Sequence, residues 1–191
     1  EGVTFRTSTH AGVDVTAEEL RRTFHVVLIA AGSEQPRDLP IPGRELKGIH
    51  FAMEFLPQHN KRNAGDAIAP ADWIDAKGKH VVIIGGGDTG ADCLGTSIRD
   101  DAASIRQFEI MPKPPAERAQ STPWPLWPLM LRTESAHKEG GDRYWSIMTT
   151  RFEGDASGHV KKLITTKVGA PPKFEPVPGT ELPPLWHWLY F

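Results

Sequence analysis

The chain has 191 residues and a formal net charge of -2, and its length suits one full domain or one domain plus part of another. The near-neutral charge excludes the basic surface of a nucleic-acid-binding protein, and no apolar stretch approaches the ~18 residues of a membrane span. The single cysteine excludes disulfides and thiolate-held metal or iron–sulfur sites within the chain, and it favours a cytoplasmic setting.

The first part of the chain predicts two strands and a short helix. Residues 3–7 alternate as in an edge strand, a polar helix is expected from Thr16, and residues 25–32 have the composition of a buried strand. The second strand ends in small residues at Gly32, where either a neighbouring element or a cofactor could approach the backbone. Both interpretations of Gly32 stay open at this point.

The next segment predicts a loop and one helix. Prolines between residues 34 and 43 exclude a regular helix or a central strand. Apolar residues at helical spacing predict a core-packed helix near residues 50–60. The polar stretch 61–79 resembles a boundary between two domains.

The functional interpretation depends on the stretch that begins at His80. A continuous apolar run up to Ile84 predicts a strand covered by helices on both faces of a parallel sheet. It is followed by the spacing G-x-G-x-x-G, by a helical pattern, and by a second strand expected at residues 104–110. The alternative is an ordinary strand-turn-helix crossover without a ligand.

In a dinucleotide site, such glycines turn the chain, admit a diphosphate to the backbone and let the helix pack closely on the strand. The N-terminus of the following helix attracts the anion. The predicted coenzyme-binding residues of this turn are Gly85, Gly86, Gly87, Asp88, Thr89 and Gly90.

Glu109 stands about 20 residues beyond the turn, at the end of the second predicted strand. A carboxylate there can accept hydrogen bonds from the adenosine ribose, which favours NADH, although a solvated strand end is the plain alternative. Lys113 and Arg118 follow and could neutralise the 2′-phosphate of NADPH, so both coenzymes remain candidates.

The second half predicts a loop, a hairpin and an unusual tail. Prolines between residues 112 and 128 predict an extended loop whose tryptophans either clamp it to its own domain or cover a flat ring. Residues 144–153 and 159–168 predict an antiparallel hairpin. The aromatic run at 185–191 would expose apolar surface unless covered, and with the missing initial Met it suggests a fragment of a longer protein.

We nominate no catalytic residue and no metal site. Hydride transfer between nicotinamide and flavin needs positioning and electrostatics rather than a protein acid or base. The eight histidines show neither H-x-x-x-H nor H-E-x-x-H spacing. Cys93, just after the glycine turn, is either a small buried filler or a thiol with a lowered pKa.

Several motifs together resemble the small (β) subunit of glutamate synthase. In chain order they are Ala30-Ala31-Gly32 with residues 36–43, residues 51–56, 83–93 and 95–99, Glu109-Ile110-Met111-Pro112 with Pro114, Pro115 and Arg118, and Pro123-Trp124-Pro125 with Trp127-Pro128. The resemblance implies a flavoprotein of the pyridine nucleotide-disulfide oxidoreductase type with two dinucleotide-binding domains. Its expected fold class is α/β, with a Rossmann-like nicotinamide-nucleotide domain of parallel and added antiparallel strands.

On this map, residues 1–43 are a partial edge of the FAD domain, with Gly32 near the flavin, and residues 44–79 are an interdomain crossing segment. Residues 80–180 are the NAD(P)H-binding domain, and residues 181–191 are an atypical C-terminal tail. The family's cysteine-rich segment and FAD-binding G-x-G-x-x-G are absent from the chain. Turnover by this chain alone is therefore not expected.

In this family the small subunit passes a hydride from NADH or NADPH to FAD. Electrons then travel through iron–sulfur clusters to the large (α) subunit, which makes glutamate from glutamine and 2-oxoglutarate. The resemblance therefore implies an electron-input oxidoreductase of nitrogen assimilation, with FAD in the full-length protein and the clusters outside this chain. The alternatives are the reductase arm of another FAD/iron–sulfur oxidoreductase, such as a pyrimidine-reducing or ferredoxin-linked enzyme, or a non-catalytic nucleotide-binding remnant. Neither nucleic acid nor membrane is an expected partner.

Overall fold

A computed structural model describes residues 2–32, 35–181, 185–186 and 188–190 of the chain. By its internal contacts the chain divides into a unit of residues 1–35 and a unit of residues 36–191, each described here by itself. Within the described ranges, every helix is too short or too polar to cross a membrane.

The first unit contains one helix and extended chain. Helix α1 (Ala17–Thr23) begins where expected, since the Thr16 hydroxyl accepts a hydrogen bond from the Glu19 N–H at 3.1 Å. The strands predicted at residues 3–7 and 25–32 are not formed, and the side chains of Phe5 and Leu28 are both 85% exposed. These two predictions are wrong because a strand needs a neighbour for its backbone groups, and the described part of this unit provides none.

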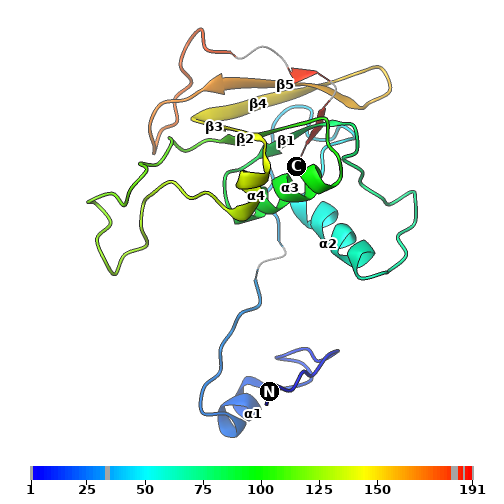
Figure 1. Ribbon diagram of the computed structural model, residues 1–191, viewed down its shortest axis with the longest axis vertical. Helices are drawn as coiled ribbons and strands as arrows, with labels where there is room; N and C mark the ends of the chain where they lie inside the picture. Colours follow the sequence, from blue (N-terminus) through cyan, green and yellow to red (C-terminus); the bar gives the residue numbers. More distant parts are fainter. Residues whose placement is uncertain (1, 33–34, 182–184, 187, 191) are drawn as a thin grey trace. The chain divides into compact units, whose positions relative to one another are not determined.

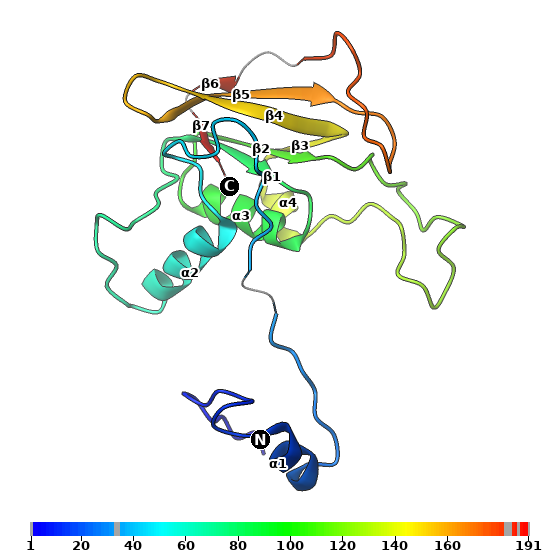
Figure 2. The ribbon, with the colours of Figure 1, turned by 180° about the vertical axis from the view of Figure 1, so that it is seen from behind.

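The second unit is built on a parallel sheet. Its strands β1 (His80–Ile84), β2 (Ser104–Glu109), β3 (Asp142–Trp145) and β7 (Trp188–Tyr190) lie in the order β3-β2-β1-β7, and every neighbouring pair is parallel. Figure 2 shows β7 at the edge of the sheet, beside β1. The expected α/β class with a Rossmann-like unit is confirmed.

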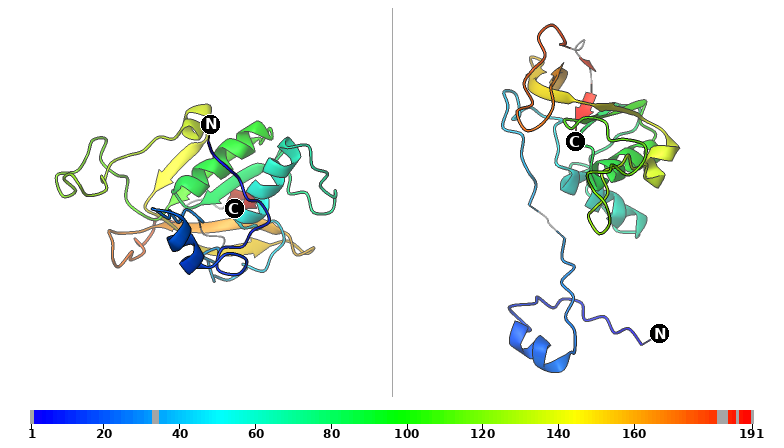
Figure 3. Two further views of the ribbon diagram at one scale, coloured as in Figure 1. Left: turned by 90° about the horizontal axis from the view of Figure 1, so that it is seen from below. Right: turned by 90° about the vertical axis from the view of Figure 1, so that its left-hand side faces the viewer.

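Helices cover one face of this sheet, and a second sheet covers the other (Figures 1 and 3). The helices are α2 (Ala52–Asn63), α3 (Asp88–Arg99) and α4 (Ser135–Glu139). The antiparallel sheet has the order β4-β5-β6, with bounds Ile147–Gly154, Val160–Lys167 and Leu185–Trp186. Helix α2 confirms the helix predicted near residues 50–60.

The covering of β1 corrects one expectation. Val81 and Ile83 belong to the core under the helices, whereas Val82 belongs to the core that includes Phe152 and Leu163 of the antiparallel sheet. The prediction of helices on both faces of the sheet is therefore wrong. A strand that is apolar on both faces requires cover on both sides, but its composition is the same under a helix and under a sheet.

The predicted hairpin forms with one difference at its start. Ser146 has a φ of 56°, which ends β3 and separates it from β4, so residues 144 and 145 pair with β2 rather than with β5. The turn expected at residues 155–158 is confirmed, with the Gly158 N–H donating to the Asp155 carbonyl at 3.1 Å. In the tail, β6 pairs with β5, and β7 pairs with β1. The expected burial of the aromatic side chains concerns side chains that the structure does not describe.

Candidate functional site

The predicted glycine turn lies between β1 and α3. Gly85 continues β1, donating its N–H to the Phe108 carbonyl at 2.8 Å, and its φ of 133° is a conformation that side chains rarely tolerate. Helix α3 then begins at Asp88. Its N-cap, Gly87, has no side chain that could accept a hydrogen bond from the first turn. The local sequence therefore produces the strand-turn-helix that the glycine spacing predicts.

The start of α3 is open. A Cβ added at Gly87 would have no heavy atom within 4 Å, so an incoming group can reach the backbone. The first helical N–H with a carbonyl partner is that of Ala91, which donates to Gly87 at 3.0 Å. Among the described residues nothing accepts from the N–H groups of Asp88, Thr89 and Gly90, which are the donors that a helix offers to an anion.

The two other glycines of the turn are needed for close packing. A Cβ at Gly86 would lie 2.3 Å from Glu109 Oε2, and a Cβ at Gly90 would lie 2.6 Å from both Gln107 Nε2 and the Gly85 carbonyl oxygen. Each of these distances is a clash. The turn thus packs directly against the end of β2.

Glu109 lies at the turn, as the sequence predicts. Its Oε2 accepts the Gly86 N–H at 2.8 Å, and its Oε1 accepts the Met111 N–H at 2.8 Å. The carboxylate is therefore fixed by two backbone donors rather than free at a solvated strand end. Each oxygen has a further lone pair for a ligand hydroxyl.

A cavity of about 480 Å³, which we call the glycine-turn cavity, opens beside these groups. One wall contains Gly86, Gly87, Asp88 and Glu109. The lining also contains three cations and an indole, which we call the cationic wall: Lys113, Arg132, Arg143 and Trp145. The cavity therefore combines main-chain donors, positive charge and a flat apolar surface.

Side-chain contacts hold the cationic wall in place. Lys113 Nζ lies 5.0 Å and the Arg143 guanidinium 5.1 Å from the centre of the Trp145 ring, within range of a cation–π interaction. Arg143 Nη1 also donates to the Arg132 carbonyl at 3.0 Å, and the Arg132 guanidinium lies 3.9 Å from the Trp127 ring centre. The wall thus joins β3 to the loop that follows β2.

Of these wall residues, Lys113 is predicted from the sequence, whereas Arg132, Arg143 and Trp145 are not. No local pattern marked the last two, because they reach the site only through the pairing of β3 with β2, at the sheet edge where ligands of open α/β sheets bind. Arg118, also named from sequence, donates to the Thr122 carbonyl at 3.3 Å and does not line the cavity.

The remaining named residues are placed as follows. Gly32 belongs to the unit of residues 1–35, where its φ is 70° and an added Cβ would meet nothing within 4 Å. Cys93 is buried, and burial raises the pKa of its thiol to about 12, so it is a filler and not a reactive thiol. Trp124 is 83% exposed and therefore does not clamp the proline-rich loop to the domain.

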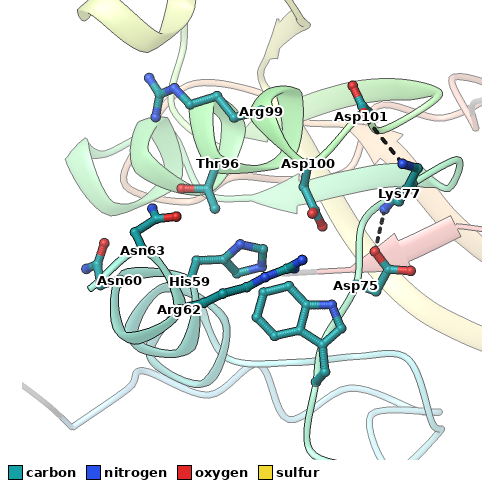
Figure 4. A pocket seen from close by; sticks show the side chains of 11 residues that line it. His59, Asn60, Arg62, Asn63, Asp75, Lys77, Thr96, Arg99, Asp100 and Asp101 are labelled. Carbon is teal, nitrogen blue, oxygen red and sulfur yellow. Dashed lines mark hydrogen bonds and ion pairs between the residues drawn. The ribbon is translucent and has the colours of Figure 1, made fainter. Parts of the chain in front are cut away.

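A second cavity, of about 580 Å³, lies between α2 and α3. Figure 4 shows its side chains, and its cations have partners: Lys77 pairs with Asp101 at 3.6 Å and Arg62 lies 4.5 Å from the Trp73 ring centre. Carboxylates alternate with these cations around the groove, and no glycine of the turn lines it. The glycine-turn cavity is therefore the candidate site.

Comparisons with known proteins show the family of the chain. The profile of the pyridine nucleotide-disulphide oxidoreductase family matches residues 2–114. The chain is 54% identical over 171 residues to the glutamate synthase [NADPH] small chain of Mycobacterium tuberculosis H37Rv, covering 88% of this chain and 35% of that protein. It is 40% identical over 193 residues to the corresponding small chain of Bacillus subtilis, covering 95% and 39%. These similarities confirm the resemblance seen in the sequence.

Another similar protein is named for the other coenzyme. The glutamate synthase [NADH] of Schizosaccharomyces pombe is 46% identical over 176 residues, which cover 88% of this chain and 8% of that protein. The fold matches that of FprA, a Mycobacterium tuberculosis oxidoreductase, with a TM-score of 0.51 and 13% identity over 95% of this chain and 52% of that one.

The chain spans about a third of the length of the curated small chains it matches. The family profile, by contrast, matches more than half of this chain and extends through the glycine turn to the start of the cationic wall. The chain belongs to the pyridine nucleotide-disulphide oxidoreductase family.

Proposed function

We propose that this chain is the coenzyme-binding part of the electron-input subunit of a glutamate synthase. On this proposal it binds NADH or NADPH in the glycine-turn cavity and presents the nicotinamide to FAD held by the rest of the subunit. The proposal is supported by the similarity to glutamate synthase small chains and by the geometry of the turn.

The observation that carries the proposal is the open start of α3. A coenzyme diphosphate fits there, because Gly87 presents no side chain and the N–H groups of the first turn have no acceptor in the described structure. A crossover without a ligand would have no need for this opening, since a serine or aspartate could cap the helix.

The cavity wall supplies the rest of the binding groups. Glu109 is held where it can accept from the adenosine ribose hydroxyls. Lys113, Arg132 and Arg143 balance the coenzyme's phosphates, and they can also accommodate the 2′-phosphate of NADPH. We therefore expect the chain to bind both coenzymes, with the carboxylate favouring NADH and the cations favouring NADPH.

The bound coenzyme supplies a hydride. The chain binds its diphosphate, orients its ribose and shields it beneath the loop of residues 112–132, and hydride transfer needs no proton donor or acceptor from the protein. We assign residues 80–180 to this coenzyme domain, 44–79 to the crossing segment and 181–191 to the tail.

The remaining parts of the proposal concern the longer protein. Residues 1–43, with Gly32, would form an edge of the FAD domain, and the large subunit would receive the electrons through iron–sulfur clusters outside this chain. The exposed apolar segment around Leu28 supports this, because exposed apolar surface of this kind often marks a site of contact with other protein. A cytoplasmic location belongs to the same proposal.

Calorimetric titration of the chain with NADH and with NADPH tests coenzyme binding directly. We expect saturable binding of at least one of them in the micromolar to low millimolar range, and no heat from either would refute the proposal. The assignment to glutamate synthase is tested with the full-length subunit and the large subunit together. Oxidation of coenzyme that requires both glutamine and 2-oxoglutarate supports it, and oxidation independent of them contradicts it.

A further inference from the structure

Two polar side chains, Gln107 and His137, form a continuous series of hydrogen bonds beside the glycine turn. The Glu134 N–H lies 3.1 Å from His137 Nδ1, His137 Nε2 lies 3.0 Å from Gln107 Oε1, and Gln107 Nε2 lies 2.9 Å from the Gly85 carbonyl oxygen. These contacts join the start of α4 to the end of β2 and to the first glycine of the turn. None of these side chains was singled out by the sequence pattern.

The direction of every bond in this chain is determined. A backbone N–H can only donate, so His137 Nδ1 is the acceptor and the proton of the neutral ring is on Nε2. That Nε2–H donates to Gln107 Oε1, which leaves the Gln107 amide N–H to donate to the Gly85 carbonyl. The opposite orientation of the Gln107 amide would place two donors together and two acceptors together.

Gln107, in the middle of this series of hydrogen bonds, packs directly against the glycine turn. Gln107 is only 2% exposed, on the face of β2 that is directed toward the helices, and its Nε2 occupies the space that a Cβ at Gly90 would need. The last glycine of the motif is therefore required by this amide as well as by the helix packing. A polar side chain this deeply buried is costly unless all its groups are bonded.

The other end of this series of hydrogen bonds lies in the lining of the cavity. Glu134 and His137 both line the glycine-turn cavity, and α4 is fixed on α3 by the Arg99–Glu139 ion pair and by Ala136, which packs against Gly95. The loop after β2 is therefore fixed at its end, at α4, just before the chain enters β3. The bonds through His137 act together with the helix contacts and with the Arg143–Arg132 hydrogen bond in locating that end.

We infer that Gln107 and His137 are positioning residues, which tie the glycine turn to the part of the cavity lining formed by Glu134 and His137 and so hold the cavity ready for the coenzyme. They touch backbone and each other, not the coenzyme's reacting atoms. The inference rests on the proposed function, because it assigns these residues a role in the same site.

Protonation of His137 would interrupt the chain of bonds. A proton on Nδ1 would face the Glu134 N–H, two donors in contact. Burial lowers the pKa of His137, with Arg143 of β3 acting in the same direction and Glu134 opposing, so the folded protein favours the neutral ring. The charged groups that act on the ring are thus Arg143 and Glu134, and β2 contributes the uncharged Gln107. Coenzyme affinity should therefore fall as the pH drops below the ordinary histidine value of 6.5.

The test uses two variants that break the bonds and one that preserves them. Gln107→Leu keeps the volume but removes both amide bonds, and His137→Ala removes the link to Glu134. His137→Gln retains an acceptor for the Glu134 N–H and a donor for Gln107, as in an ordinary capping box, but it cannot titrate. Lys138→Ala, an exposed change on the same helix, is the matched control.

NADPH affinity is measured by calorimetry for each protein across about pH 5 to 8, the range in which histidine titrates. We expect the dissociation constant to rise about fivefold or more in Gln107→Leu and His137→Ala, the effect of losing a buried hydrogen bond. His137→Gln should bind as the unaltered chain does at neutral pH and should lose the pH dependence. Lys138→Ala should keep both the affinity and the pH profile.

Two results would overturn the inference and are distinguishable from each other. If folded Gln107→Leu and the unaltered chain bind NADPH equally well, the positioning role is refuted while the proposed function stands. If the unaltered chain binds no coenzyme, the proposed function falls and the positioning role with it. Should Gln107→Leu not fold, the comparison of His137→Gln with His137→Ala decides, because a purely structural role would not restore affinity while removing its pH dependence.

Discussion

Replacing Gly87 with serine should improve the helix and damage the binding site at the same time. Gly87 is the N-cap of α3, has a φ of -81°, and has no heavy atom within 4 Å of an added Cβ. The serine side chain therefore fits without strain, and its hydroxyl can accept the N–H of Thr89 or Gly90. Serine is a somewhat better N-cap than glycine, so the free energy of unfolding should stay unchanged or rise by a few tenths of a kcal/mol.

The same hydroxyl removes what the diphosphate needs. It occupies the opening at Gly87, which lines the glycine-turn cavity, and takes one of the N–H donors at the start of α3 that are unpaired in the described structure. A hydrogen bond to a charged group contributes about 1.5–3 kcal/mol, so its loss should weaken coenzyme binding roughly ten- to hundredfold.

Chemical denaturation and calorimetric titration of the same preparation measure the two effects. Gly169→Ala, which adds a methyl group at a position where the nearest heavy atom lies 3.8 Å from the new Cβ, is the control for side-chain addition. Unchanged affinity in Gly87→Ser would refute the idea that the diphosphate lies on this turn. A loss of both stability and affinity would show that the opening is not as free as the structure indicates.

Three further predictions concern single side chains. Glu109→Ala removes the acceptor of the Gly86 and Met111 N–H groups, so stability should fall by about 1 kcal/mol and NADH binding should weaken relative to NADPH; an unchanged coenzyme ratio, with exposed Glu117→Ala as control, would remove Glu109 from the ribose site. Cys93 should resist thiol reagents near pH 8 in the folded chain and react on unfolding, because its pKa is raised to about 12; rapid labelling of the native protein would contradict its burial. The pKa of Asp155 is lowered to about 2 by hydrogen bonds from the Ser157 hydroxyl and the backbone of His159 and Ser157, so its stabilising effect should be complete above the ordinary value of 3.8 and be lost as the pH falls through about 2. Asp155→Asn should flatten the pH dependence of the thermal midpoint over that interval, and an unaltered slope would show that the carboxylate is not held in the turn.

The failures of sequence-based prediction share a cause. The strand expected at residues 25–32 has the right composition but no partner among the described residues of its unit, and strand formation depends on a partner. The split at Ser146 was missed because the residues on both sides are equally strand-like, and only the pairing of β3 with β2 and of β4 with β5 separates them.

The sequence by itself determined the glycine turn and the acid beside it. Gly85 meets a demand on backbone angle, Gly90 a demand of close packing, and Gly87 keeps the start of α3 open. Glu109 follows from the same logic, since the length of one strand-helix-strand unit places the end of β2 next to the turn.

Only the tertiary structure decided what faces that turn. The residues of the cationic wall lie on a loop and on β3. The contact between Gln107 and His137 joins residues that no local pattern relates. Such contacts depend on where a loop returns to the sheet and on which layer covers each face. Hydrophobic periodicity determines that a face is buried, but not which element buries it.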